Sequence, residues 1–463
     1  MLARLALLTT VGAMTLSACT MAPTYERGIL PVPGQFPAEA LSVSAETQAQ
    51  TLAWRQVFLD PRLQAVIAQS LDNNRDLRVA VLNVERTRQQ YRIQRAGLLP
   101  GVNAGLSGTR GDTGQVDTSG NPVGETEVYS ATIGAAWEID LFGRVRSLSQ
   151  AAQGTYFAAG ENRKAAQISL ISAVASTWLT LAADQEQLRL SRETLRSREE
   201  SLDLTQRRFD AGASDQLALR QAQVLTEQAR GDVALLSALV QQDQNALRLL
   251  VGADVAAENL PDAFPDRAVL ADLPVGVPSE VLLKRPDVLS AEYNLKAANA
   301  NIGAARAAFF PSISLTGSVG KASTDLGQLF DGTDTWTFSP SISVPIFAGG
   351  ANRANLGVAN ASRDIALAQY EQAIQSAFRD VSDQLATRST IDERLAAQTR
   401  VVEAAADSNA LAQARFTQGV DSRLTLVDAE RTSYGAQQQL ISIRLVRAVN
   451  LVNLYAALGG GFE

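Results

Sequence analysis

Histidine is absent from this chain of 463 residues, and cysteine occurs once, at position 19. The absence of histidine removes the commonest general base, the nucleophile systems that depend on it and the commonest zinc ligand. A lone cysteine excludes an intramolecular disulfide and a cluster of thiolate ligands. Gly320-Lys321 also lacks the upstream glycine of a phosphate-binding loop. We therefore predict that the chain is not an enzyme and holds no metal or dissociable cofactor.

Positive charge is also scarce, since 41 Lys and Arg residues stand against 48 Asp and Glu residues. A surface that neutralises a phosphate backbone carries an excess of positive charge, so no nucleic-acid partner is expected. Hydrophobic residues make up 46% of the chain and charged residues only 19%. This balance excludes a disordered chain, and the length is sufficient for two or three domains with large cores.

The single cysteine follows a segment with the pattern of a secretory signal peptide. A short basic start and an apolar run lead to Leu16-Ser17-Ala18-Cys19, which resembles a bacterial lipobox. We predict that residues 1–18 are removed and that Cys19 carries a covalent lipid, which tethers a protein without spanning the bilayer. Thr20, in place of Asp, suggests sorting to the outer membrane. The alternative is an ordinary signal peptide whose cysteine is incidental.

Residues 165–183 carry no charge and are long enough for a transmembrane helix. The helix that they predict nevertheless has a polar stripe along one face, formed by Ser169, Ser172, Ser176 and Thr180. The corresponding residues 373–386 of the second half contain Arg379, Asp380 and Asp383, which a lipid-exposed helix does not readily accommodate. We predict water-facing helices and no transmembrane helix.

The second half of the chain repeats motifs of the first half. Arg208-Phe209-Asp210-Ala211-Gly212 matches Arg415-Phe416-Thr417-Gln418-Gly419, and Leu-x-Leu follows both at the same distance. Such register indicates a structural repeat. The predicted divisions are a signal peptide (1–18), a lipid-anchored lead (19–60), a first repeat (61–252), a Pro-rich surface linker (253–286) and a second repeat (287–463).

Each half contains two segments in which apolar and small polar side chains alternate. They lie at about residues 100–110, 128–141, 311–320 and 336–346. Alternation predicts strands with one apolar and one polar face. A soluble sandwich has the same division, but the strand lengths, together with Tyr129, Trp137 and Trp336 at possible interface positions, favour a membrane barrel.

Four strands cannot close a barrel, because an open edge in lipid leaves backbone hydrogen-bonding groups unsatisfied. Two copies would supply eight strands, and side chains would fill the interior. Three copies would supply twelve strands and leave a lumen. We therefore predict a homotrimer in contact with outer-membrane lipid.

The rest of each repeat is predicted to be helical over unusual lengths. Residues 147–209 contain no proline and predict one long helix. The chain then turns near Gly212, and a second long helix returns to Gly252. Residues 352–458 repeat this pattern, with the turn near Gly419. Four apolar residues recur every seven positions, the spacing of a coiled-coil seam: Leu188, Leu195, Leu202 and Phe209. The fold class is therefore mixed and mainly α, with long antiparallel coiled-coil hairpins, four strands and an internal two-fold repeat.

Several further motifs are specific in combination. They are Trp54-Arg55 with Phe58 and Asp60-Pro61, Asn73-Asn74-Arg75-Asp76-Leu77-Arg78, Arg285-Pro286-Asp287-Val288, and the run from Ile302 to Ile313. With the lipobox, they resemble the TolC-like outer-membrane factors, in the lipoprotein branch of the OprM and NodT type, over essentially the whole mature chain. The resemblance implies a trimeric α-barrel continuous with a 12-stranded transmembrane β-barrel in the outer membrane of a Gram-negative bacterium. It also implies two partners, a periplasmic membrane-fusion adaptor and an inner-membrane RND-type pump.

The resemblance assigns roles to residues near the helix turns. Gly212 and Gly419 match the tips that contact the adaptor, where glycine admits a positive φ and close approach of a partner backbone. Leu424 and Asp428 lie four residues apart and so project from one helix face. They match the periplasmic gate of the family, in which three copies form an apolar ring and an acidic ring.

Two departures from the family pattern concern the contacts that close this gate. Relatives often carry tyrosine where this chain has Phe209 and Phe416, so a hydroxyl contact proposed to latch the tips cannot form here. Ala218 also lacks an acidic side chain that some relatives have nearby. The sequence therefore does not identify the contacts that hold the gate closed.

Three functions remain in competition. The first is the outer-membrane channel of a tripartite efflux pump that exports drugs or other small toxic compounds, passive because the chain has no evident energy source. The second is the outer duct of a type I protein secretion system, and the third is a lipid-anchored coiled-coil stalk or adhesin. An adjacent gene for an RND pump and its adaptor would favour the first, and one for a peptide-exporting ABC transporter the second.

Overall fold

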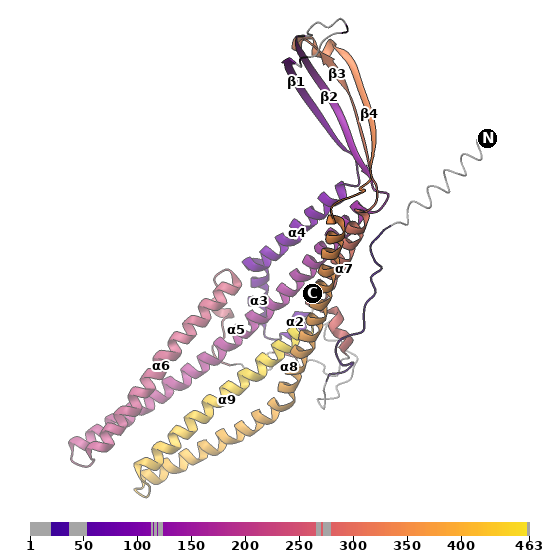
Figure 1. Ribbon diagram of the computed structural model, residues 1–463. Coiled ribbons are helices and arrows are strands. Elements are labelled where there is room, and N and C mark those ends of the chain that lie inside the picture. The colour runs from indigo at the N-terminus through magenta and orange to yellow at the C-terminus, as the bar shows by residue number, and fades with distance from the viewer. Residues whose placement is uncertain are drawn as a thin grey trace. The chain divides into compact units, whose positions relative to one another are not determined.

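The computed structural model describes residues 20–36, 53–112, 114, 118, 124–264, 270–271 and 279–460 (Figure 1). The helices are α2 (Trp54–Val57), α3 (Pro61–Asn73), α4 (Arg75–Ala96), α5 (Arg144–Asp210), α6 (Gln216–Val251), α7 (Pro286–Ala307), α8 (Ala351–Thr417) and α9 (Arg423–Ala457). The strands are β1 (Gly101–Asp112), β2 (Glu125–Ile139), β3 (Ser312–Ser323) and β4 (Thr333–Ser343). Short 3-10 helices occupy Ala257–Asn259, Ser279–Lys284 and Leu326–Asp331.

The chain forms two compact units, and each unit takes segments from both halves of the sequence. The sheet unit contains the described residues of 1–29, 83–160 and 290–371, and the hairpin unit those of 30–82, 161–289 and 372–463. Each sequence repeat therefore passes through both units, so the repeat does not mark a boundary in space.

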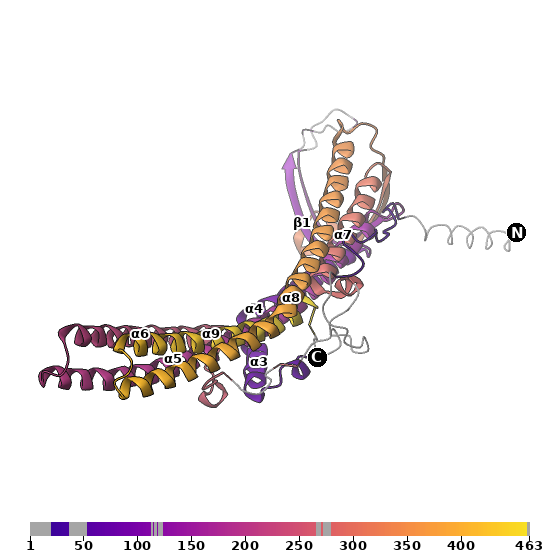
Figure 2. The same cartoon turned by 90° about the horizontal axis from the view of Figure 1, so that it is seen from below.

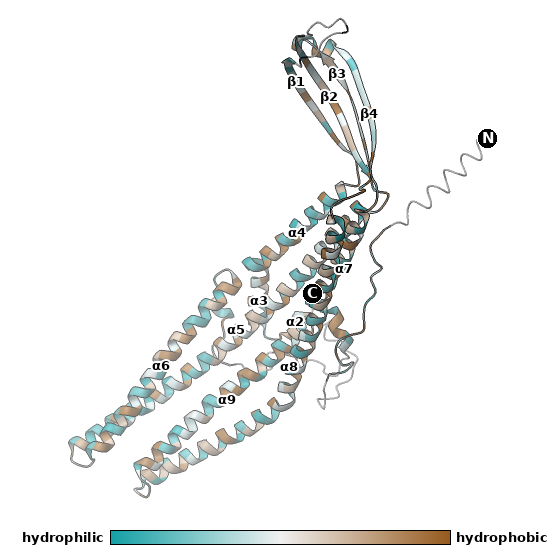
Figure 3. Ribbon diagram, in the orientation of Figure 1, coloured by the Kyte–Doolittle hydropathy of each residue, from teal (hydrophilic) through white to brown (hydrophobic). Residues whose placement is uncertain are grey.

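The four predicted strands are present and form one antiparallel sheet in the order β1-β2-β3-β4. The pairing places Ala104 opposite Ile133, Ile133 opposite Val319, and Val319 opposite Trp336. The apolar residues of all four strands thus share one face, and Figure 3 shows hydropathy alternating along each strand. This register confirms the two-faced sheet that the sequence pattern predicted.

Small hydroxyl side chains pair across neighbouring strands on the other face. Three such pairs have oxygen–oxygen distances of 2.7 to 2.9 Å: Ser107–Ser130, Ser314–Ser341 and Ser318–Thr337. Hydroxyl pairs of this kind stabilise a sheet and keep this face polar without bulk.

The strands extend further toward the hairpin ends than predicted and end earlier at the opposite end. β2 begins at Glu125 and β4 at Thr333, before the predicted starts at residues 128 and 336. The prediction that Val344 and Ile346 belong to the last strand is wrong, because β4 ends at Ser343. Pro345 follows directly, and proline cannot donate a ladder hydrogen bond.

The helix over residues 165–183 packs as its polar stripe predicted. Leu170, Val174, Trp178 and Leu181 are buried, whereas the serines of the stripe are exposed or half-buried. By length and composition alone, α5 and α9 each contain a stretch apolar enough to cross a membrane, and half of each stretch is buried within the protein. Burial of that extent is also what core helices of water-soluble assemblies show.

The linker between the repeats contributes to the core of the hairpin unit. Leu270 and Leu282 are buried, and the backbone of Leu270 pairs with that of Phe58. The Phe58 ring meets Tyr455 edge-on, with ring centroids 5.4 Å apart. The interpretation of residues 253–286 as a surface linker therefore missed its buried leucines, since its frequent prolines hide any periodic pattern.

Candidate gate at the helix turns

The α5–α6 and α8–α9 hairpins of the hairpin unit run side by side (Figure 2) and end in two turns of the same geometry. In the first turn, Gly212 has a φ of 72° and its N–H donates to the Phe209 carbonyl over 2.9 Å, while the Ala213 N–H reaches back to the Arg208 carbonyl over 2.7 Å. This pair of bonds is the Schellman motif that ends a helix on a left-handed residue.

The second turn repeats these bonds in the same register. Gly419 has a φ of 76°, and its N–H donates to the Phe416 carbonyl over 3.0 Å. The next helix begins in the same way in both hairpins, because Asp215 caps α6 at the Ala218 N–H and Ser422 caps α9 at the Thr425 N–H. The predicted need for a left-handed glycine in each turn is confirmed. A role for Gly212 and Gly419 in contacting a partner stays a prediction.

Leu424 and Asp428 lie on the first two turns of α9, and both are exposed. Leu424 keeps 70% of its surface accessible, whereas Leu426 between them is buried at 1%. Among the described residues, the Asp428 carboxylate has no ion-pair partner, and only its backbone carbonyl accepts a bond, from Thr432 Oγ1. An exposed leucine and an unpaired carboxylate on one helix face are not explained by packing within a single chain.

Ion pairs and hydrogen bonds hold α9 near this end. Arg415 forms two hydrogen bonds of 2.7 and 2.9 Å to the Asp421 carboxylate across the α8–α9 turn. Arg423 donates to Ser201 Oγ of α5 over 2.5 Å, and its guanidinium lies 5.6 Å from the Phe416 ring centroid. Phe416 thus offers a ring face to the Arg423 guanidinium.

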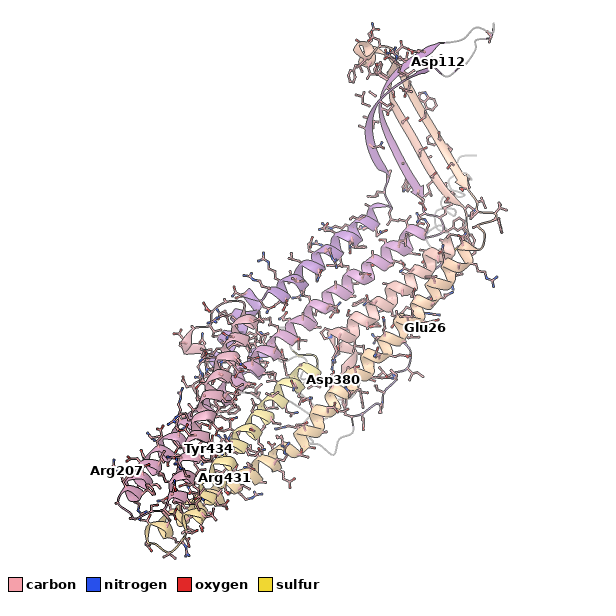
Figure 4. The ribbon with its side chains drawn as sticks, turned by 60° about the vertical axis from the view of Figure 1, so that its left-hand side comes forward. Glu26, Asp112, Arg207, Asp380, Arg431 and Tyr434 are labelled. Carbon is pink, nitrogen blue, oxygen red and sulfur yellow. The ribbon has the colours of Figure 1, made fainter. Side chains whose placement is uncertain are left out.

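A second contact joins the two hairpins further along α9, at Tyr434 (labelled in Figure 4). Its hydroxyl lies 2.7 Å from Ser191 Oγ of α5 and 3.4 Å from a carboxylate oxygen of Asp232 on α6. Arg198 faces the same ring at 5.8 Å. Sequence reasoning missed this cluster, because Tyr434 is more than 200 residues from the other members and the cluster belongs to no motif.

The carboxyl groups of Asp184 on α5 and Asp243 on α6 interact between the helices. Partial burial raises the pKa of both carboxyls, and the neighbouring charge of Asp184 helps to raise the pKa of Asp243 to about 6. Two carboxyls this close prefer to share a proton. The pair therefore stabilises the fold at acidic pH and loses that contribution as the pH rises through about 6, since an unfolded aspartate ionises near 4.

Asp243→Asn is expected to stabilise the protein at pH 8 by about 1 kcal/mol relative to the unmodified chain, after allowance for solvent screening. At pH 4.5 the difference should shrink, because the pair then holds its proton. Thermal unfolding followed by circular dichroism at both pH values measures this. Asp203→Asn, an exposed aspartate of α5 paired with Arg207, serves as the control. An equal effect of Asp243→Asn at both pH values would contradict the shared proton.

Two further predictions from the sequence concern a lipidation site and the absence of a metal site. Cys19, the predicted lipidation residue, lies outside the described residues. In the part of the chain that the structure describes, no group of three or more acidic, histidine or cysteine side chains is arranged to hold a metal ion.

Comparison with known proteins gives consistent matches over the whole chain. A model of the family described as outer membrane efflux protein matches residues 66–253 and 277–460. The toluene efflux pump outer membrane protein TtgC of Pseudomonas putida is 46% identical over 457 residues, which cover 98% of this chain and 94% of TtgC. The antibiotic efflux pump outer membrane protein ArpC of Pseudomonas putida matches with the same identity and coverage.

Solved structures give the same result for the fold. The crystal structure of the open state of the MtrE outer membrane channel of Neisseria gonorrhoeae aligns with a TM-score of 0.84 at 42% identity. The alignment covers 96% of this chain and 99% of that chain.

Proposed function

Because this chain belongs to the outer membrane efflux protein family, we propose that three copies of it assemble into the exit duct of a tripartite efflux pump. The chain is an efflux component of the outer membrane of Gram-negative bacteria, and it has the fold of outer-membrane channels. Passage through the duct is passive, and a partner supplies the energy.

The observation that carries the proposal of three copies is the four-stranded sheet. Within the described residues, β1 and β4 each have one edge without a paired strand, while the sheet has one apolar and one small polar face. In a bilayer the backbone groups along these two edges must form hydrogen bonds with other strands. The edge strands of neighbouring copies can supply these bonds, because they have similar lengths and the same two faces. Twelve strands from three copies leave a polar lumen.

We further propose that Leu424 and Asp428 form the periplasmic gate. Both are exposed in the single chain, so three copies around one axis would place an apolar ring next to an acidic ring. The turns at Gly212 and Gly419 are proposed to contact a periplasmic membrane-fusion adaptor, which connects the duct to an RND-type pump in the inner membrane. The repeated turn geometry offers the adaptor two similar surfaces in each copy.

The cargo is proposed to be drugs and other small toxic compounds. TtgC is named for toluene efflux and ArpC for antibiotic efflux, and this chain is 46% identical to both. The lipidation of Cys19 is also part of the proposal, and it would anchor the mature amino terminus to the outer membrane.

The mass of the detergent-extracted protein, with bound detergent subtracted, tests this assembly. We expect three times the mass of one mature chain, and single-channel conductance from the same preparation in planar bilayers. A stable monomer without conductance would overturn the duct in favour of a lipid-anchored stalk, because four strands alone leave open edges in lipid.

A further inference from the structure

Residues 20–27, which we call the N-terminal strap, lie along one face of α7 in the sheet unit (Glu26 is labelled in Figure 4). Arg306 donates to the Met21 carbonyl over 3.1 Å and Asn299 to the Pro23 carbonyl over 2.6 Å. Tyr25 and Arg27 both bind Glu292. The strap therefore runs antiparallel to the helix.

The spacing of these contacts fits an extended segment on a helix. Glu292, Asn299 and Arg306 are seven residues apart in turn, so they share one helix face over about 21 Å. Residues 21 to 27 span about 20 Å when extended. The two elements thus match in length, and each contact falls in register with the next.

Glu292 is the strongest point of attachment. Arg27 holds both carboxylate oxygens at 2.9 and 2.8 Å through Nη2, and the Tyr25 hydroxyl donates to Oε1 over 3.0 Å. Lys296 completes the cluster, 3.2 Å from Oε1 and 5.0 Å from the Tyr25 ring centroid. The Glu292 side chain is only 4% exposed. Burial acts to raise the pKa of this carboxyl, but the bonds from Arg27 and Tyr25 hold the pKa below its ordinary value.

Two features of α7 match the strap in the folded chain. A buried carboxylate that loses a hydrogen-bonded cation destabilises a protein strongly. Gly303 leaves no room for a side chain, since a Cβ there would lie 2.6 Å from the Ala22 nitrogen, 2.9 Å from the Ala22 Cα and 2.6 Å from Ser147 Oγ of α5. The surface of α7 is thus shaped for the main chain of the strap, whereas chain termini are otherwise commonly mobile.

We propose that the strap is a fixed clamp, bound through Glu292, which holds the acylated amino terminus at the foot of the sheet. The amino-terminal end of the strap, at Thr20, lies beside the last turn of α7. β3 begins five residues after that helix. The lipid anchor is then held at a fixed distance from α7, the helix that leads into β3. This inference rests on the proposed lipidation of Cys19 for the nature of the anchor, but not for the clamp.

Trypsin cleavage after Arg27 in the detergent-extracted protein tests the clamp, because trypsin then reaches the periplasmic face. Trypsin must extract the Arg27 side chain, which Glu292 holds, so the cut is expected to be slow in the unmodified protein. Glu292→Gln is expected to speed the cut at least about tenfold, because proteolysis follows the population of the open segment. Tyr25→Phe, which leaves α7 unchanged, is expected to speed it severalfold.

Glu85→Gln is the matched control, since among the described residues this exposed carboxylate of α4 bonds only to Arg88 and Gln89 of its own helix. Equal cleavage rates in the unmodified protein, Glu292→Gln and Tyr25→Phe would overturn the clamp. The mass of the released peptide Cys19–Arg27 tests the anchor separately. An acylated mass supports the anchor at the foot of the sheet, and an unmodified mass overturns the anchor while the rates still decide the clamp.

Discussion

Asp428→Ala is expected to lower the preference of the channel for cations by severalfold in planar bilayer recordings. Three exposed carboxylates around one axis attract cations into a narrow passage and repel anions, and Asp428 has no ion-pair partner among the described residues that would cancel its charge. The effect should decrease at high ionic strength, because salt screens exposed charges. The reversal potential in a salt gradient measures the change.

Leu424→Ala in the otherwise unmodified protein is expected to raise the single-channel conductance, since it removes an apolar side chain that is 70% exposed next to the proposed acidic ring. Glu403→Ala, an exposed carboxylate of α8, is the control for charge alone. Unchanged selectivity in Asp428→Ala, or an equal change in Glu403→Ala, would move the constriction away from the start of α9.

The contacts around α9 indicate what such a gate must break to widen. Arg423 binds Ser201, and Tyr434 binds Ser191 and Asp232, so α9 is attached to the neighbouring hairpin at two levels. Neither contact uses the tyrosine that this chain lacks at position 416. The hairpins are therefore attached in this chain although residue 416 has no hydroxyl group.

Local pattern was sufficient to predict the strands and the hairpins. Alternation in residues 128–141 and the glycines at 212 and 419 each act through neighbouring residues, and the structure contains the corresponding strand and turns. Strand ends were less accurate, because an end depends on the partner strand and not on pattern alone. Thr333 extends β4 since it lies opposite Ala322 in β3.

Long-range polar contacts could not be predicted in the same way. Glu292 and Arg27 are 265 residues apart, and a glutamate in a helix ordinarily indicates a solvated face. Asp184 and Asp243 likewise face each other only because α6 returns along α5. The positions of such pairs depend on the three-dimensional packing of whole helices, which no single-sequence periodicity specifies.

Gly320→Ala is expected to abolish most of the assembled trimer, which detergent-subtracted mass and the yield in outer-membrane fractions would measure. A Cβ at position 320 of β3 would lie 2.2 Å from the Ala131 carbonyl oxygen and 2.8 Å from the Thr132 Cα of β2. Both neighbours are backbone atoms of a paired strand, so no side-chain rotation relieves the contact. The β2–β3 pairing must shift, and overpacking that forces such backbone shifts costs about 1–3 kcal/mol or more.

Gly111→Ala separates lack of space from the loss of a glycine. Gly111 lies in β1 of the same sheet, and a Cβ there meets no atom within 4 Å, so this variant should assemble normally. In a barrel of three copies the strained β2–β3 pair occurs three times, and a strand that shifts also misaligns the edge offered to the next copy. A single methyl group added at position 320 is therefore expected to hinder closure of the whole barrel. Normal assembly of Gly320→Ala would instead mean that β2 and β3 separate more easily than their register implies.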